Sequence, residues 1–277
     1  MLRPLGKDDY FRILPLLEGH PPSYFPIVAR AIVQGNTRGR FWVDDALKPS
    51  KLLMWDDGPI LGLCGDASDS TFNGELSELL GQTVAPQALA HGNSGFKIYY
   101  TPDWEGYLSA IFPESSLQKR DRSIYGFGEL RIKDWNSNIP DGSSIRRIDS
   151  ALLESNDLVN LDRVTEEIAC CWTSVDQFLD KGFGFCVISG DIIAGWCTAE
   201  YASDTDIGIG IETVEEYQGR GFGTLVACAF IEHCLSKGLK PYWDCWKSNL
   251  PSSALAEKVG FRKLGDYPVF VGRFVAA

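Results

Sequence analysis

Glycines stand at positions 219, 221 and 223, directly before a helical pattern of apolar residues. A chain keeps glycine where φ is positive or where another group approaches the main chain closely. The residues from Leu225 to Leu235 predict a helix that is apolar on almost every side and stops at Gly238. Because the first turn of a helix carries unpaired N–H groups and the positive end of its dipole, this segment predicts an anion site suited to a phosphate.

Two common phosphate-binding loops do not fit this segment. A Walker A loop ends in Lys followed by Ser or Thr, and no such pair follows these glycines. In the dinucleotide fingerprint G-x-G-x-x-G, the last glycine position is occupied in this chain by Thr224. The glycines therefore indicate a different class of phosphate binder.

The charge and hydropathy patterns restrict the partners. The formal net charge is −11, and Lys and Arg form no basic run, whereas binding to nucleic-acid phosphates needs clustered positive charge. We therefore expect no nucleic-acid partner and a cationic or neutral substrate. No apolar stretch approaches the roughly 18 to 20 residues of a membrane span, and the first residues lack a signal-peptide core. We expect a cytoplasmic protein with no membrane partner.

The cysteines and histidines predict no metal site. Eight cysteines lie in apolar runs without C-x-x-C spacing, and the three histidines are far apart in the sequence. We expect the cysteines to be buried, reduced thiols that pack as small hydrophobic groups.

The chain is long enough for two domains, with 277 residues of which 44% are hydrophobic. Gly, Pro, Ser and Asn are frequent in residues 134–144, which we predict to be the linker. We expect a smaller α+β domain at residues 1–140 and a second domain at 141–277. In the first domain, Tyr99, Tyr100 and Trp104 are predicted either as strand core or as the wall of a substrate cleft.

The second domain has an ordered pattern of strands and helices. A helical region is predicted through Thr165 to Leu179, and Asn249 is a predicted N-cap for a later helix. The predicted strands are SIRRID at 144–149, three consecutive antiparallel strands at 182–189, 192–201 and 207–214, PYWDCW at 241–246 and a closing strand at 268–275. The glycines and their helix directly follow the third consecutive strand.

The segment from Gln218 to Gly223 resembles the Q/R-x-x-G-x-G/A signature of the GNAT N-acetyltransferase superfamily, and it lies between a predicted strand and a predicted helix. A second segment resembles the superfamily pattern N-x-x-A-x-x-L-Y-x-K-x-G-F; the matching residues are Asn249, Ser252, Leu255, Lys258, Gly260 and Phe261. The run IETVEEYQGRG together with YWDCW is similar to a bacterial subgroup of long GNAT proteins that includes antibiotic-resistance acetyltransferases. The resemblance implies the α+β GNAT fold, a mixed, splayed and mostly antiparallel sheet flanked by helices, in the C-terminal half.

The resemblance also implies acetyl-CoA as cosubstrate and transfer of its acetyl group to an amine by direct attack. The N–H groups of the glycine segment would hold the pyrophosphate, and an N–H near Thr213 or Val214 would meet the thioester oxygen. The residues assigned to the cofactor are Thr213, Val214, Gln218, Gly219, Arg220, Gly221, Phe222, Gly223, Thr224, Asn249 and Ser252. The acceptor is expected to be a primary amine of a small molecule, and the protein a monomer or homodimer.

Direct attack needs an unprotonated amine, so a base near the thioester is expected. Glu212 interrupts an apolar strand just before the glycines and is the first candidate, with Asp206, Glu200 and Asp244 as alternatives. Side chains alternate along a strand, so Glu212 points either toward the reacting carbon or away from it. The superfamily position that often carries a Tyr to protonate the leaving thiolate is Ala256 in this chain. Tyr201, Tyr242 and Cys245 are the substitutes for that acid, with solvent as the remaining alternative.

Two other functions stay open on the sequence. Because the usual Tyr is missing, the chain is also consistent with a non-catalytic acyl-CoA-binding or regulatory module. An acidic cleft would equally suit a lysine side chain, which makes a protein-lysine acetyltransferase the third possibility.

Overall fold

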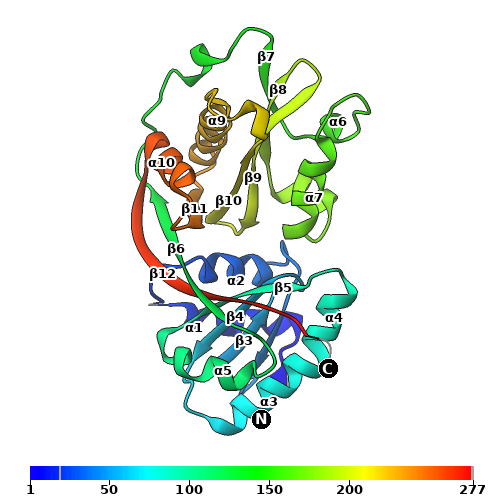
Figure 1. Ribbon diagram of the computed structural model, residues 1–277, viewed down its shortest axis with the longest axis vertical. Helices are drawn as coiled ribbons and strands as arrows, with labels where there is room; N and C mark the ends of the chain where they lie inside the picture. Colours follow the sequence, from blue (N-terminus) through cyan, green and yellow to red (C-terminus); the bar gives the residue numbers. More distant parts are fainter. Residues whose placement is uncertain (19, 276–277) are drawn as a thin grey trace. The chain divides into compact units, whose positions relative to one another are not determined.

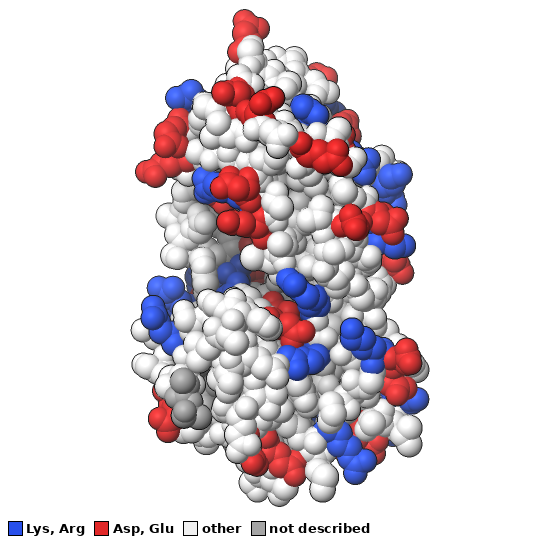
Figure 2. All heavy atoms as spheres, turned by 90° about the vertical axis from the view of Figure 1, so that its right-hand side faces the viewer, with Lys and Arg blue, Asp and Glu red and all other residues white. Residues whose placement is uncertain are grey.

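The computed structural model describes residues 1–18 and 20–275 (Figure 1). It divides into two compact units. Unit 1 comprises residues 1–34, 38–122 and those from Asp266 on, and unit 2 comprises residues 35–37 and 123–265. In the part of the chain that the structure describes, no helix is long and apolar enough to cross a membrane. On the face drawn in Figure 2, acidic and basic side chains are interspersed in small groups.

Unit 1 is an α+β unit built on a sheet of six strands. Its strands are β1 (Arg3–Pro4), β2 (Arg40–Val43), β3 (Lys51–Trp55), β4 (Ile60–Gly65), β5 (Gly95–Tyr100) and the second part of β12 (Phe261–Arg273). Its helical segments are η1 (Lys7–Ile13), α1 (Leu14–Leu17), α2 (Phe25–Val33), α3 (Ser70–Leu79), the π-helical η2 (Leu80–Val84), α4 (Ala85–Ala90), η3 (Pro102–Tyr107) and α5 (Leu108–Ile111). Tyr99, Tyr100 and Trp104 are all buried in this unit, so they belong to its core.

Unit 2 carries the glycine segment. Its strands are β6 (Gln118–Phe127), β7 (Ser143–Arg147), β8 (Gly184–Ser189), β9 (Ile192–Ala202), β10 (Asp206–Thr213) and β11 (Lys240–Trp246). Its helical segments are η4 (Trp135–Asn138), α6 (Ser150–Leu153), α7 (Leu161–Cys171), α8 (Val175–Lys181), η5 (Glu215–Tyr217), α9 (Phe222–Ser236) and α10 (Leu250–Val259). Helix α9 packs against β8, β9 and β10 and buries most of its residues, as its apolar sequence predicts (Figure 1).

The two units repeat one strand order. In unit 1 the order is β1-β2-β3-β4-β5-β12, and all neighbouring pairs are antiparallel except β4 and β5, which are parallel. In unit 2 the order is β7-β8-β9-β10-β11-β6, and β10 and β11 are again the parallel pair. A helical segment joins the parallel strands in both units, as a crossover connection requires. The sequence itself predicts no repeat, because what the units share is topology and not a run of similar residues.

Apart from residues 35–37, the chain passes from one unit to the other inside two strands. The first part of β6 belongs to unit 1 and the rest to unit 2, while β12 begins in unit 2 and ends in unit 1. These crossing points differ from the linker predicted at residues 134–144 and from the predicted boundary at residue 140. The predicted ranges therefore leave β6 in the first domain, although it is the neighbour of β11 in the sheet.

Strands β10 and β11 separate after a short paired segment. Their parallel register joins Asp206 to Lys240 and Gly208 to Tyr242, and among the described residues the pairing stops there. Strand β10 continues to Thr213 and β11 to Trp246. The later part of β10 therefore has one edge without a partner strand, and the fork in the sheet lies at Gly208.

Candidate functional site

The glycine segment, residues 218–224, forms a turn between β10 and α9. Gly219 has φ of 76° and Gly221 has φ of 85°, a left-handed region that other residues rarely adopt. Gly221 is also the N-cap of α9 and has no side chain to accept from the first N–H groups of the helix. The Nε2 of Gln218 donates to the carbonyl oxygen of Thr213 at 3.1 Å and holds the turn against the end of β10. The N-terminus of α9 is thus uncapped by any side chain, as an anion site requires.

Gly223 is glycine for a different reason. A Cβ built on it would lie 3.1 Å from Oγ1 of Thr213 and 3.2 Å from Cδ2 of Leu255, which is tighter than ordinary contact. The missing side chain lets α9 approach both β10 and α10.

A hollow of about 620 Å³ opens beside the glycine segment. It is lined from β10 by Ile211, Glu212 and Thr213, from the turn and α9 by Tyr217, Gln218, Gly219, Gly221, Phe222, Gly223 and Thr224, and from β11 and α10 by Trp243, Asn249, Pro251, Ser252, Ala254, Leu255 and Lys258. Most of the residues assigned to the cofactor from the sequence therefore surround one cavity. Of the described residues predicted for the site, Val214, Arg220, Tyr242 and Cys245 do not line it.

Positive charge lies at and near this hollow. The Nζ of Lys258 donates to Oγ1 of Thr224 in the first turn of α9 at 3.1 Å. The Arg220 guanidinium lies 4.9 Å from the centre of the Tyr217 ring, which stacks on Phe222. From the sequence, Lys258 was recognised only as part of a motif, because nothing in the sequence places a residue of α10 beside the start of α9.

The beginning of α10 is fixed by its own side chains. Asn249 is the N-cap, as predicted, and its Oδ1 accepts from the N–H of Ser252 at 3.2 Å. The hydroxyl of Ser252 accepts from Nε1 of Trp243 at 3.0 Å. Both predicted residues thus have a structural role at the wall of the hollow.

The unpaired edge of β10 presents alternate backbone groups. The N–H of Val214 donates to the carbonyl of Ala194 in β9 at 2.9 Å, so it does not face the fork. In an antiparallel pair, residues alternate between those bonded to the neighbour and those that point to the other side. Thr213 and Ile211 therefore direct their N–H and C=O groups away from β9, toward the side of β11. Of the two residues predicted to meet the thioester oxygen, only Thr213 has its N–H on that side.

Glu212 lies on the face of the sheet that α7 covers. Its Oε1 forms an ion pair with the guanidinium of Arg163, and both side chains are a little under half exposed. The Arg163 guanidinium also lies 5.3 Å from the centre of the Trp196 ring. The sequence left the direction of Glu212 open, and its Arg163 partner places its side chain on the face opposite α9.

A second carboxylate, Glu167, lies on the same face and was not among the residues predicted from the sequence. Its Oε2 accepts from Nε1 of Trp196 and its Oε1 from the hydroxyl of Thr198, both at 2.6 Å. Burial raises the pKa of Glu167, and the carboxylates of Glu200 and Glu212 add to that shift, while the two hydrogen bonds oppose it. The only hint in the sequence is its spacing of four from Arg163, which puts both residues on one side of a helix.

The other predicted catalytic residues are spread out. Asp206 is buried at the first position of β10, where its N–H donates to Oγ of Ser203. Tyr242 is paired with Gly208 at the fork. Cys245 is buried on the side of α10, with its Sγ 3.5 Å from Oγ of Ser253. Cys245 is three positions after Tyr242, so the two point to opposite faces of β11.

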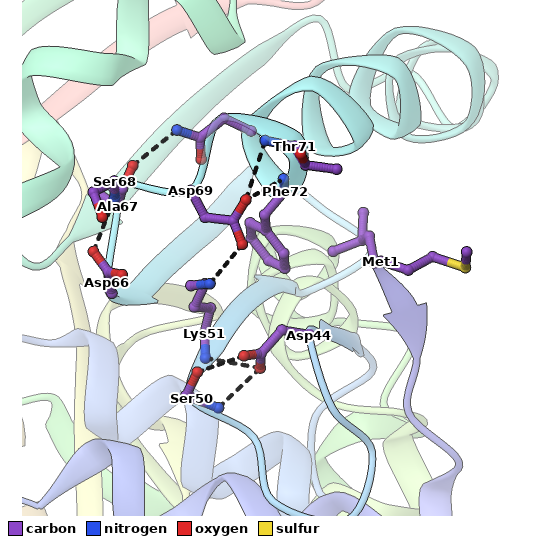
Figure 3. A network of polar contacts seen from close by, with 12 residues as sticks. Met1, Asp44, Ser50, Lys51, Asp66, Ala67, Ser68, Asp69, Thr71 and Phe72 are labelled. Atoms are coloured by element: carbon purple, nitrogen blue, oxygen red, sulfur yellow. Dashed lines mark hydrogen bonds and ion pairs between the residues drawn. The ribbon is translucent and has the colours of Figure 1, made fainter.

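The matching place in unit 1 is built from carboxylates. Helix α3, which follows β4 as α9 follows β10, is capped by Asp69, whose Oδ1 accepts from the N–H groups of Thr71 and Phe72 at 3.1 Å (Figure 3). The other oxygen of Asp69 pairs with Nζ of Lys51 at 2.8 Å. The Nε1 of Trp104 donates to the carbonyl of Gly65 at the end of β4. The start of α3 is therefore already occupied by negative charge from its own chain.

Comparisons with known proteins agree with this geometry. A family model described as GNAT acetyltransferase matches residues 18–270. An uncharacterized N-acetyltransferase of Bacillus subtilis strain 168, YdfB, is 27% identical over 271 residues, which are 98% of each chain. A GCN5-related N-acetyltransferase-like protein from Streptococcus suis 89/1591 has a TM-score of 0.72 at 21% identity and covers 96% of this chain and 99% of its own. A tandem GNAT protein from the clavulanic acid biosynthesis pathway has a TM-score of 0.62 at 13% identity. The match covers 100% of this chain and 99% of that protein's chain.

Proposed function

The chain belongs to the GNAT acetyltransferase family, an acyltransferase family, and from that premise we propose that it transfers the acetyl group of acetyl-CoA to a primary amine of a small molecule. The observation that carries the proposal is the adjacency of two features in unit 2. A glycine turn at the uncapped start of α9 meets the unpaired edge of β10, and both line the same hollow.

Each feature suits one part of acetyl-CoA. The N–H groups of residues 219–224 suit the pyrophosphate, and Lys258 and Arg220 add positive charge nearby. The backbone groups of Thr213 and Ile211 suit the amides of an extended arm, which would lie along the open edge as an added strand does. An N–H on that edge, of Thr213 or of Ile211, would then meet the thioester oxygen.

The reaction needs a neutral amine at the thioester carbon. The amine nitrogen attacks that carbon, the new C–N bond forms, and the C–S bond breaks to release coenzyme A. Glu212, the candidate base from the sequence, lies at the rim of the hollow, where its Oε1 is paired with the Arg163 guanidinium. Ala256, at the position of the usual Tyr, is fully buried and supplies no acid. Of the predicted substitutes, Tyr242 is paired with Gly208 at the fork.

The proposal is tested by binding of acetyl-CoA to the glycine segment. Saturation at about 100 times the dissociation constant should stabilise the fold by roughly 2.7 kcal/mol and raise Tm. Gly221→Val should abolish this rise, because a side chain there enters the space of the phosphates. Gly190→Val is the matched control, since Gly190 also has positive φ, 65°, and open space around it, but lies in the β8–β9 turn.

Acetyl transfer is then followed as free thiol released from acetyl-CoA with a panel of primary amines, aminoglycosides and lysine peptides. Loss of the Tm rise in Gly221→Val alone, with thiol release that depends on a small amine, is the expected result. No rise in wild type at millimolar acetyl-CoA would refute the cofactor site. Binding without transfer to any acceptor would favour the non-catalytic module, and transfer only to peptides would favour a lysine acetyltransferase.

A further inference from the structure

Helix α7 presents two charged residues to the open part of β10. Arg163 and Glu167 are four residues apart, on one side of the helix. Arg163 contacts Glu212, and the carboxylate of Glu167 lies against Gly210, where a Cβ would collide with its Oε1. Gly210 and Glu212 share one face of β10, because residues two apart point to the same side.

The position of Gly210 along β10 is informative. The fork in the sheet lies at Gly208, and the glycine segment lies beyond Thr213 at the other end of the open edge. An arm that starts at the glycine segment passes Thr213 and Ile211 and then reaches the level of Gly210. The interval from Thr213 to Gly210 is about 10 Å at about 3.3 Å per residue. The far end of such an arm, which carries the reacting carbon, therefore comes beside Glu167.

We propose that Glu167 is the catalytic base that accepts the proton of the acceptor ammonium, an inference that rests on the proposed function. One proton passes from the ammonium to a carboxylate oxygen of Glu167, and the freed lone pair attacks the thioester carbon. As the C–S bond breaks, the second N–H proton balances the thiolate, which leaves as the thiol of coenzyme A. Glu167 then releases its proton to solvent, so the products are an amide, a thiol and one proton.

The surroundings of Glu167 suit this role. Its neighbours on β9 are the neutral donors Trp196 and Thr198 and the carboxylate Glu200, and across the sheet lies the thiol of Cys197. From β10 it faces Glu212, whose carboxylate is paired with Arg163 of the helix that carries Glu167. The bonds from Trp196 and Thr198 end on different carboxylate oxygens, so each oxygen keeps acceptor capacity for an ammonium proton. The residue as a whole is partly and not wholly buried.

Glu212 is less suited as the base than Glu167. Its Oε1 is already held in the ion pair with the Arg163 guanidinium, which leaves less of the carboxylate for an acceptor ammonium. Burial and neighbouring carboxylates raise the pKa of Glu167, which strengthens it as a base. We assign the Arg163–Glu212 pair a positioning role at the rim.

A binding experiment tests the inference without knowledge of the natural acceptor. S-(2-aminoethyl)-coenzyme A carries an ammonium close to where the attacking nitrogen would lie, and S-ethyl-coenzyme A lacks it. Wild type should bind the ammonium analogue at least about tenfold more tightly by calorimetry, since a charged hydrogen bond forms. Glu167→Gln should bring the two affinities to within about twofold. Glu166→Gln, the exposed neighbour with the same change of charge, should keep the preference.

The pH dependence supplies a readout that a purely structural role would not move. The preference of the wild-type protein for the ammonium analogue over S-ethyl-coenzyme A should fall as pH drops through the raised pKa of Glu167. The protonated acid no longer pairs with the ammonium. In turnover with the best amine of the panel, Glu167→Gln should lose about 100-fold at pH 7 and recover toward high pH. Glu212→Gln should keep the wild-type pH profile.

The outcomes separate the two proposals. If S-ethyl-coenzyme A itself fails to bind wild type, the cofactor site is wrong and the inference falls with it. If it binds but wild type shows no preference for the ammonium analogue, or Glu167→Gln keeps that preference, the inference alone is overturned. It is also overturned if Glu212→Gln, and not Glu167→Gln, changes the pH profile.

Discussion

Gly210 lets a carboxylate lie directly against the main chain of β10. A Cβ at this position would collide with Oε1 of Glu167 and lie 3.1 Å from Oγ1 of Thr198. These two atoms are hydrogen-bonded to each other, so a methyl group at Gly210 would displace the pair together. At the residue scale, a methyl group added at Gly210 of β10 would therefore move the Glu167 side chain of α7.

We expect Gly210→Ala to bind S-ethyl-coenzyme A as wild type does but to lose the preference for the ammonium analogue, because Glu167 is pushed from the strand. Calorimetry with both analogues checks this. The control is Gly265→Ala on β12, where a Cβ would meet no atom within 4 Å. An unchanged preference in Gly210→Ala would show that Glu167 does not need the space that this glycine leaves.

The starts of helices α9 and α3 differ in charge, although they hold matching positions in the repeated strand order. Residues 218–224 place glycines and an arginine before and within the first turn of α9, with Lys258 beside it. The loop before α3 instead carries Asp66 and Asp69, and Asp69 accepts the N–H groups of the first turn (Figure 3). A pyrophosphate at α3 would meet these carboxylates at close range, where like charges repel.

At the element scale we therefore predict that each chain binds one molecule of acetyl-CoA and not two. Calorimetric titration should give a stoichiometry close to one, and Gly221→Val should remove the binding completely. A second site that survives in Gly221→Val would place cofactor binding in unit 1 as well. As a matched comparison, Asp69→Asn should leave the stoichiometry unchanged, because it removes a charge without creating a glycine turn.

For the whole molecule, the sixth strand of each sheet comes from a distant part of the chain. Unit 1 takes the end of β12, where Phe270–Arg273 pair with Gly95–Ile98 of β5. Unit 2 takes β6, which neighbours β11. Neither unit is therefore a continuous stretch of sequence, and a cut at residue 140 removes a strand from unit 2.

We predict that a fragment of residues 141–277 is less stable than one of residues 118–277, because only the longer fragment contains β6. Without β6, β11 becomes an open edge, which favours aggregation. Both fragments contain β12 and both lack β5, its partner strand in unit 1, so this loss affects them equally. Urea unfolding and acetyl-CoA binding compare the two. Equal stability and affinity would support the domain boundary at residue 140.

The sequence by itself determined the features that depend on local geometry. Glycines that need positive φ, the apolar pattern of α9 and the Asn249 cap all follow from bonding within a few residues. The turn, its helix and the next helix were therefore predicted in the right order. The resemblance of two motifs to a known family implied the GNAT fold, which the comparisons confirm. Most of the residues assigned to the cofactor line the hollow for the same reason.

Only the tertiary structure decided which distant residues meet. The approach of Glu167 to Gly210 and of Lys258 to Thr224 joins segments more than 30 residues apart, and no local pattern records it. β12 ends in unit 1 and most of β6 belongs to unit 2 because these strands pair with strands far apart in the chain. The composition of a linker does not reveal such pairing. The direction of the Val214 N–H was likewise fixed by its partner in β9, because the neighbouring strand sets which backbone groups of an edge stay free.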